Sequence, residues 1–180
     1  MANLEGDYSL NGFYLLAGTK GLQEGNIHFF PDGKAIGTMG DDNKKTKLLF
    51  GPQGPTPRKI LIGYMSPEKE LYLLKIPDLH QMTQDVIWAL KEKDKTKLTF
   101  KGGYTLLGRA GTSFAVALIP GLEDILTTAK IPDNNSLIKL MSGVNSKILS
   151  ERIFTKENYK LVMVDSASCE QVGEITLKKI

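Results

Sequence analysis

The fold is indicated most clearly by one stretch, Arg58-Lys-Ile-Leu-Ile-Gly-Tyr-Met65, which is followed by Ser66-Pro-Glu-Lys69 and then by Glu70-Leu-Tyr-Leu-Leu-Lys-Ile76. The first and last of these segments are typical of β-strands, because leucine, isoleucine and tyrosine dominate them. The segment between them predicts a turn, since its proline has no N–H for a strand ladder. Both strands carry apolar residues on both faces, and such strands need cover on both sides. We therefore expect a second layer, either the far wall of a barrel or a packed helix.

Short strands and tight turns continue on both sides of this stretch. The predicted strands cover residues 8–16, 24–30, 34–39 and 45–50 before it, and residues 95–101, 103–109 and 112–119 after it. Alternation along the first strand puts Tyr8, Leu10 and Tyr14 on one face. In the second strand, Ile27 and Phe29 share a face, and His28 points to the opposite side beside Phe30. Pro31-Asp32-Gly33 predicts a hairpin turn, because proline presets φ and glycine accepts the left-handed conformation.

Helical spacing interrupts this pattern at three places. Asp78 is a suitable N-cap, and Leu79, Met82, Val86 and Leu90 follow it at intervals of three or four, which predicts a helix over residues 78–91. A short helix is predicted over residues 121–130 and a longer amphipathic one over residues 136–152. Two strands, at residues 159–165 and 170–179, end the chain and can pair as a terminal hairpin.

These elements predict a single α+β domain over residues 1–180, predominantly antiparallel β. Residues 1–119 form a β-meander or barrel core with one inserted helix near 78–91, and residues 120–180 form a helical cover and the terminal hairpin. We expect a large curved sheet or barrel of about ten strands, with two or three helices packed on it, mostly C-terminal.

The opening Leu4-Glu-Gly6-Asp-Tyr8, followed by meander hairpins, resembles the start of calycin barrels. The resemblance covers roughly the first 35 residues and implies the fold alone. Because Trp88 falls in the predicted helix rather than at the family's signature position, no binding residue is carried over.

Composition excludes several classes of function. Twenty-three Lys and Arg against 20 Asp and Glu leave a net charge of +3, too small for an obligate nucleic-acid coat, and no nucleic-acid partner is expected. A single cysteine, Cys169, excludes an intrachain disulfide framework and a cysteine-based zinc site. The longest apolar run, Phe114–Ile119, falls far short of the ~20 residues of a membrane span. No signal segment is visible, so we expect a soluble cytoplasmic protein, although signal-independent export would leave the same sequence features.

Motifs for catalysis are also poorly supplied. Gly103-Tyr-Thr-Leu-Leu-Gly108-Arg109-Ala110 spaces two glycines like a phosphate-binding loop but lacks the lysine and the Ser/Thr that follow them there. Ser113 lacks the flanking glycines of a nucleophile elbow. The lysines of residues 91–97 alternate with acids and predict a solvated charge run. No catalytic residue, cofactor or metal ligand is therefore predicted.

The leading hypothesis is a non-enzymatic binding domain with an aromatic and apolar pocket on or inside the curved sheet. Aromatic bodies with polar tips suit a small apolar or mixed-polarity ligand, and the candidate ligand-binding residues are Tyr14, His28, Phe30, Tyr64, Tyr72 and Tyr104. Two alternatives stay open. One is a protein–protein interaction or effector module that binds its partner through the loop 51–57 or the helix 136–152. The other is an enzyme centred on His28 or Asp165, which requires His28 to face a lumen rather than the surface.

Overall fold

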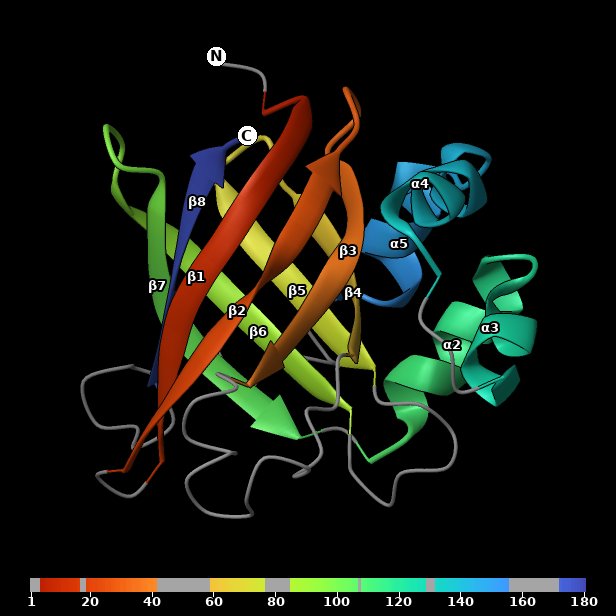
Figure 1. The fold of residues 1–180 in the computed structure, drawn as a ribbon, viewed down its shortest axis with the longest axis horizontal. Helices are drawn as coiled ribbons and strands as arrows, with labels where there is room; N and C mark the ends of the chain where they lie inside the picture. The colour runs from red at the N-terminus through yellow and green to blue at the C-terminus, as the bar shows by residue number, and fades with distance from the viewer. Residues whose placement is uncertain are drawn as a thin grey trace.

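A computed structural model describes residues 4–16, 19–41, 59–76, 85–106, 108–128, 132–155 and 172–180. Within these ranges eight strands form a closed barrel in the order β1 to β8, each antiparallel to its neighbours, with β8 pairing back onto β1 (Figure 1). This is the up-and-down barrel order. The predicted class, antiparallel β with mostly C-terminal helices, is confirmed, with eight described strands and four helices. The predicted strands 45–50 and 159–165 lie outside the described residues.

The strands have the following bounds: β1 Gly6–Leu16, β2 Thr19–Phe29, β3 Lys34–Asp41, β4 Lys59–Met65, β5 Glu70–Ile76, β6 Val86–Asp94, β7 Thr99–Leu106 and β8 Val172–Lys179. The helices are α2 Ala110–Leu118, α3 Leu122–Thr128, α4 Asn134–Ser142 and α5 Ser146–Arg152. Figure 1 shows that these helices lie together on one side of the barrel, outside β3, β4 and β5.

Glycines allow the wall to bend where neighbouring strands come close. A Cβ atom on Gly25 of β2 would lie 1.9 Å from the carbonyl oxygen of Thr38, and one on Gly37 of β3 would lie 1.9 Å from that of Asn26. No side chain fits at such distances. Glycine at these two positions of neighbouring strands lets β2 and β3 curve into the barrel, a device that closed sheets require.

The inside of the barrel is filled mostly by apolar side chains from alternate strand positions. The predicted faces of β1 and β2 are confirmed, since Tyr8, Leu10 and Tyr14 pack with Ile27 and Phe29 in this interior cluster. Its further members include Leu61, Leu73, Trp88, Leu90, Phe100 and Ile175.

A second apolar cluster lies between the outer face of the barrel and the helices. Ile36, Ile62, Leu74 and Ile87 point outward from β3, β4, β5 and β6 and pack with helix residues such as Leu137 and Leu149. We call these four strands, with the helices on them, the covered wall. Both predicted kinds of second layer are therefore present: the opposite strands of the barrel cover the inner faces, and the helices cover the outer ones.

A buried carboxylate connects the covered wall to helix α2. Asp85 precedes β6 and is fully buried, and its Oδ2 accepts a hydrogen bond of 2.7 Å from the backbone N of Thr112. Its Oδ1 accepts another of 2.7 Å from the Thr112 hydroxyl and lies 3.7 Å from Nη1 of Arg109. The residue at the N-cap position of α2 offers no side-chain cap. Asp85 thus supplies the negative charge that a helix N-terminus favours, from a distant part of the sequence.

A buried ammonium connects the wall to helix α4 in the complementary way. Lys34 at the start of β3 is almost fully buried, and its Nζ donates to the carbonyl oxygens of Val144 at 2.7 Å and Ser142 at 3.4 Å. Nζ also lies 3.3 Å from Oδ2 of Asp32 and 4.8 Å from the centre of the Phe30 ring. Lys34 therefore satisfies carbonyls at the C-terminus of α4, where positive charge is favourable.

Two predicted elements are wrong in type. Residues 86–91 of the predicted helix 78–91 lie in strand β6, and residues 77–84 are outside the described residues. Val86 and Leu90 are four positions apart, a separation that fits both a helix and an alternating strand. The predicted strand 112–119 is instead helix α2, in which Gly111 and Ala115 are buried four residues apart and Asp85 supplies the cap.

The predicted helix 136–152 is divided in two. Asp133 rather than Asn134 caps α4, accepting from the backbone N of Ser136 at 2.8 Å. The helix ends at Gly143, and Asn145 then caps α5 by accepting from the backbone N of Lys147 at 2.9 Å. The short helix predicted over residues 121–130 is confirmed as α3. Strand β8 is confirmed within 170–179 and pairs with β1 and β7.

Candidate functional site

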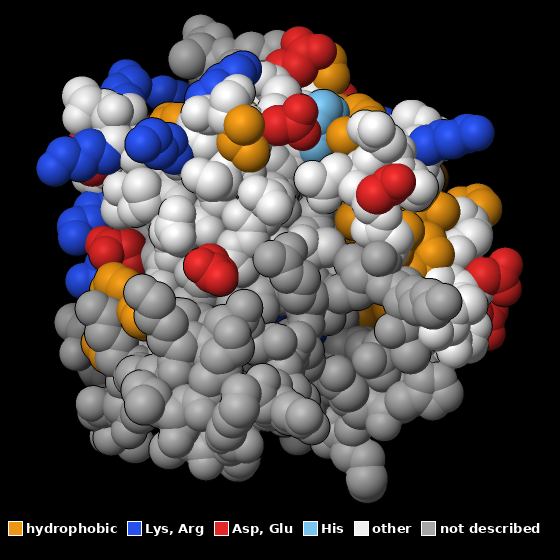
Figure 2. Space-filling model, viewed as in Figure 1, with side chains coloured by type: hydrophobic (Ala, Val, Ile, Leu, Met, Phe, Trp, Pro, Cys, Tyr) orange, Lys and Arg blue, Asp and Glu red, His pale blue; other side chains and the backbone are white. Residues whose placement is uncertain are grey.

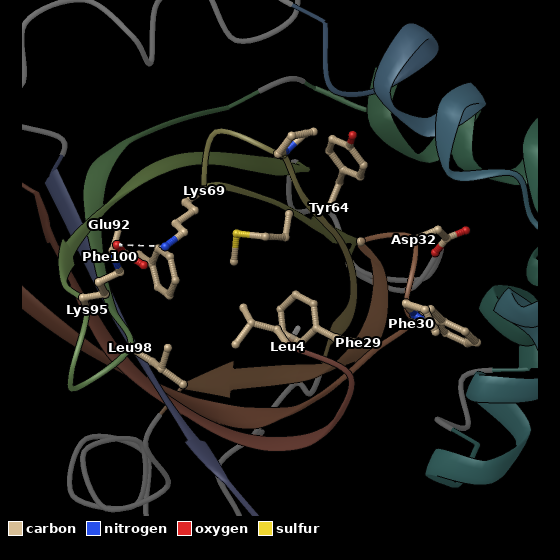
Figure 3. A pocket seen from close by; sticks show the side chains of 14 residues that line it. Leu4, Phe29, Phe30, Asp32, Tyr64, Lys69, Glu92, Lys95, Leu98 and Phe100 are labelled. Carbon is tan, nitrogen blue, oxygen red and sulfur yellow. Dashed lines mark ion pairs between the residues drawn. The ribbon is translucent and has the colours of Figure 1, made fainter. Parts of the chain in front are cut away.

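A cavity of about 350 Å³ opens at one end of the barrel, which we call the mouth. The mouth lies where the hairpins that join β2 to β3, β4 to β5 and β6 to β7 come together beside Leu4, just before β1 (Figure 3). Its volume is at the small end of ligand pockets, which span about 300–1,000 Å³.

The deeper part of the mouth is apolar. Phe29 and Phe100 point into the barrel from the ends of β2 and β7, and Leu4 and Leu98 lie above the interior cluster against which they pack (Figure 3). Met65 completes this surface from β4. The arrangement removes an apolar ligand body from water without requiring the barrel interior to open.

Charged side chains stand at the edge of this apolar surface. Nζ of Lys69 lies 4.0 Å from Oε1 of Glu92, with both side chains partly exposed (Figure 3). Lys95 is exposed on the same side of the cavity, in the turn after β6. Asp32 also lines the cavity, but it points toward the helices and pairs with Lys34.

The three hairpins at the mouth are fixed by local hydrogen bonds. The predicted turn at Pro31-Asp32-Gly33 is confirmed, with Gly33 at φ 95° and its N donating to the Phe30 oxygen at 3.0 Å. In the β6–β7 turn, Oδ1 of Asp94 accepts from the hydroxyl of Thr96 at 2.7 Å and from its backbone N at 3.0 Å. These bonds lower the pKa of the Asp94 carboxyl.

Two non-glycine residues in the described ranges have positive φ angles, and both line the mouth. Lys69 has φ 61° and Leu98 has φ 48°, each at the last turn position before a strand. Glycine or asparagine is usual where a hairpin turn needs the left-handed conformation, because a Cβ is crowded there.

The six predicted binding residues do not form one site. Phe30 and Tyr64 border the cavity, but their rings point away from it toward the helices and pack against the second apolar cluster (Figure 3). Burial, with the nearby carboxylates of Glu68 and Asp32, raises the pKa of Tyr64. Tyr14 and Tyr104 lie inside the barrel, 5.8 Å apart between ring centres, and are not part of the mouth. The ring of Tyr72 is outside the barrel, stacked on Phe154 at 6.0 Å.

His28 faces outward, so it does not have the lumen placement that the enzyme alternative requires. Its Nδ1 lies 2.9 Å from Oδ1 of Asp7, and its ring meets that of Phe30 edge-on at 4.9 Å. The hollow beside it has only about 20 Å³, which is room for about one water molecule. The described surroundings of His28 thus offer no space for a substrate, and Asp165 lies outside the described residues.

The described surfaces give little support to the alternative of a protein–protein interaction or effector module. Loop 51–57 is outside the described residues, and the apolar side chains Leu137, Met141 and Leu149 of the predicted helix are buried against the barrel. Ile148 remains 39% exposed on α5. In Figure 2 Lys and Arg side chains gather at the upper left. Lys93 pairs with Glu174 at 2.7 Å.

Sequence reasoning missed most of the residues that line the mouth: Leu4, Phe29, Met65, Lys69, Glu92, Leu98 and Phe100. The predicted strands could not reveal the site, because strand 45–50 puts the turns at 31–33 and 66–69 at opposite ends of a meander, and residues 95–98 were predicted as strand. In the observed barrel every second turn lies at the same end, so the turns at 31–33, 66–69 and 95–98 belong together. The inward residues next to those turns then have to face one another.

Comparisons with protein-family models, curated proteins and solved structures gave no match for this chain. Across the described ranges no helix has the length and hydropathy of a membrane span, and no cluster of His, Cys, Asp or Glu side chains is arranged to hold a metal ion.

Proposed function

We propose that the protein binds a small, largely apolar ligand in the mouth of the barrel and does not convert it chemically. The observation that carries the proposal is the cavity of about 350 Å³, apolar where it meets the barrel core and charged at its edge. Concave, mostly apolar pockets with a few polar groups are the usual form of small-molecule sites.

The structural setting supports binding at this place. Phe29 and Phe100 belong to the packed barrel core, so the base of the cavity is pre-formed. A pre-formed apolar base reduces the ordering cost of association. The three hairpins above it supply the rest of the surface, and binding residues are commonly found on loops held by a rigid scaffold.

The test is binding of the fluorescent apolar probe 1-anilinonaphthalene-8-sulfonate. We expect saturable binding to the wild-type protein and loss of most of that binding in Leu4→Trp, because the larger ring fills the mouth. The matched control is Leu22→Trp, which adds the same ring to an outer-wall position that is 37% exposed. Equal probe binding by wild type, Leu4→Trp and Leu22→Trp contradicts the proposal, and so does the absence of binding to the wild type.

A further inference from the structure

Two residues that line the mouth have a backbone conformation that residues other than glycine rarely adopt. Lys69 and Leu98 occupy equivalent positions in two hairpins, each as the last residue before a strand, and each has a positive φ. A branched or long side chain in this region is strained, and such strain concentrates at binding sites. Backbone hydrogen bonds hold both residues: the N of Lys69 donates to the Ser66 oxygen within its own turn at 3.0 Å, and the Leu98 oxygen accepts from the N of Leu177 in β8 at 3.0 Å.

The two side chains differ in chemistry. Leu98 lies over the apolar part of the cavity near Phe100 and packs against the interior cluster, whereas Lys69 brings an ammonium to its edge (Figure 3). A hairpin needs neither side chain, since glycine or asparagine would satisfy both turns. Lys69 adds a cationic contact and Leu98 an apolar contact to the lining of the same cavity.

Two lysines and two acids line the cavity, and one of the acids is paired with a lysine outside it. Asp32 is matched by the buried Lys34 at 3.3 Å. Glu92 is shared with Lys69 at 4.0 Å, a separation longer than a direct hydrogen bond. Lys95 adds a second ammonium that none of the described hydrogen bonds or ion pairs engages. An incoming anion can therefore meet Lys69 and Lys95 together while Glu92 keeps its long contact.

From this placement we infer that the ligand is an amphiphile with an anionic head group, such as a carboxylate, which binds at Lys69 and Lys95 with its apolar body beneath Leu98. The inference rests on the proposed function and specifies the ligand class of the same cavity. Lys69 and Leu98 are the residues that select this class.

The experiment compares three ligands of equal chain length, decanoate, decan-1-ol and decylamine, as competitors of the fluorescent probe. We expect decanoate to bind about tenfold more tightly than decanol, since a charge-assisted contact at a half-buried site contributes on this order. Decylamine should bind no better than decanol. Tighter binding of decylamine, removed by Glu92→Gln, overturns the inference in favour of a cationic head group.

Variants assign the preference to the named residue. Lys69→Met is expected to bind decanoate and decanol equally, and Lys69→Arg to keep the preference. Lys91→Met is the matched control, because it removes an exposed lysine of the outer wall that does not line the cavity. Circular dichroism verifies that each variant is folded, and if Lys69→Met does not fold, Lys69→Gln replaces it.

The failure of this inference differs from the failure of the proposed function. If none of the three ligands displaces the probe and the probe itself does not bind, the proposed function is wrong. If decanoate and decanol bind equally well to the wild type, or if Lys91→Met and Lys69→Met lose the preference alike, the cavity binds ligands but does not select an anion at Lys69.

Discussion

In the covered wall, Asp85 and Lys34 are buried charges, and each lies 2.7 Å from a backbone group at a helix end. In the mouth, Lys69 and Glu92 stand 4.0 Å apart at the edge of a hollow, and two turn residues have positive φ. The wall pairs these two charges with helix ends and packs its outer face against the helices, whereas the mouth keeps a hollow and a longer charge separation. Departures from folding rules gather where a protein binds rather than where it holds itself together, so substitutions in the two regions should act in opposite ways.

The largest effect is expected for Asp85→Ala. The substitution leaves the Thr112 N–H and hydroxyl without their buried acceptor and removes the cap of α2. The loss of unfolding free energy should be about 3–4 kcal/mol, measured by urea denaturation. Thr112→Val, which keeps the contact to the backbone, should lose less. Equal losses in the two variants would show that the carboxylate does not act on the helix end.

A slightly smaller effect is expected for Leu74→Ala in the covered wall. Leu74 is fully buried under the helices and touches the space beside Gly111, so its truncation leaves a cavity. About 3 kcal/mol should be lost in urea denaturation. Leu98→Ala in the mouth should cost about 1 kcal/mol or less, because its side chain borders a hollow that is already present. A similar loss of unfolding free energy in Leu74→Ala and Leu98→Ala would contradict the expected difference between the covered wall and the mouth.

Lys34→Met tests the second charged anchor. Methionine keeps the apolar stem but withdraws the ammonium from the carbonyl oxygens of Val144 and Ser142. We expect a loss of about 1–2 kcal/mol in thermal or urea unfolding. An unchanged midpoint would mean that these carbonyls find other donors.

Alkaline pH should weaken the fold through Tyr64 at the rim and Tyr8 in the interior. Burial raises the pKa of both phenols, and Glu68 and Asp32 add to the effect at Tyr64. Above about pH 10 the unfolded chain loses these protons before the folded one does, so stability falls as pH rises through that range. Tyr64→Phe should flatten the decline in unfolding midpoint between pH 9 and 11. A steeper decline of the unfolding midpoint in Tyr64→Phe would contradict the expected direction of the pH effect.

The smallest effect, and the only gain, is expected for Lys69→Asn in the mouth. Asparagine adopts the left-handed conformation more readily than lysine, so the variant should be more stable by about 0.5–1 kcal/mol. The measurement is the urea midpoint, compared with Glu68→Asn in the same turn. A lower urea midpoint for Lys69→Asn would show that substitutions in the mouth reduce stability as they do in the covered wall.

Much of the barrel could be predicted because the spacing of apolar residues in its strands is visible in the sequence. Alternation in 8–16 and 24–30 put Tyr8 with Leu10 and Ile27 with Phe29 on shared faces, and in the structure these are the inner faces. The two-sided apolar residues of 59–65 and 70–76 required cover on both faces, and both covers exist. These predictions depend on local spacing alone, which closure of the barrel does not change.

The errors arose where distant residues decide the structure. The spacing of Val86 and Leu90 fits both a helix and a strand. They lie in a strand because β6 pairs with β5 and β7. Helix α2 takes its cap from Asp85, more than twenty residues earlier, which no local pattern reveals. The site was missed for a related reason: aromatic residue type selected Tyr14, Tyr72 and Tyr104, whereas the mouth is defined by which turns share an end.

Each turn of the mouth closes one strand pair: 31–33 joins β2 to β3, 66–69 joins β4 to β5, and 95–98 joins β6 to β7. A residue added to the turn at 31–33 shifts the pairing of neither β4 with β5 nor β6 with β7, because each hairpin closes its own strand pair. The barrel can thus change one turn at a time without refolding, which suits it to diversification. Libraries that randomise these turns separately give a direct route to receptors with new preferences.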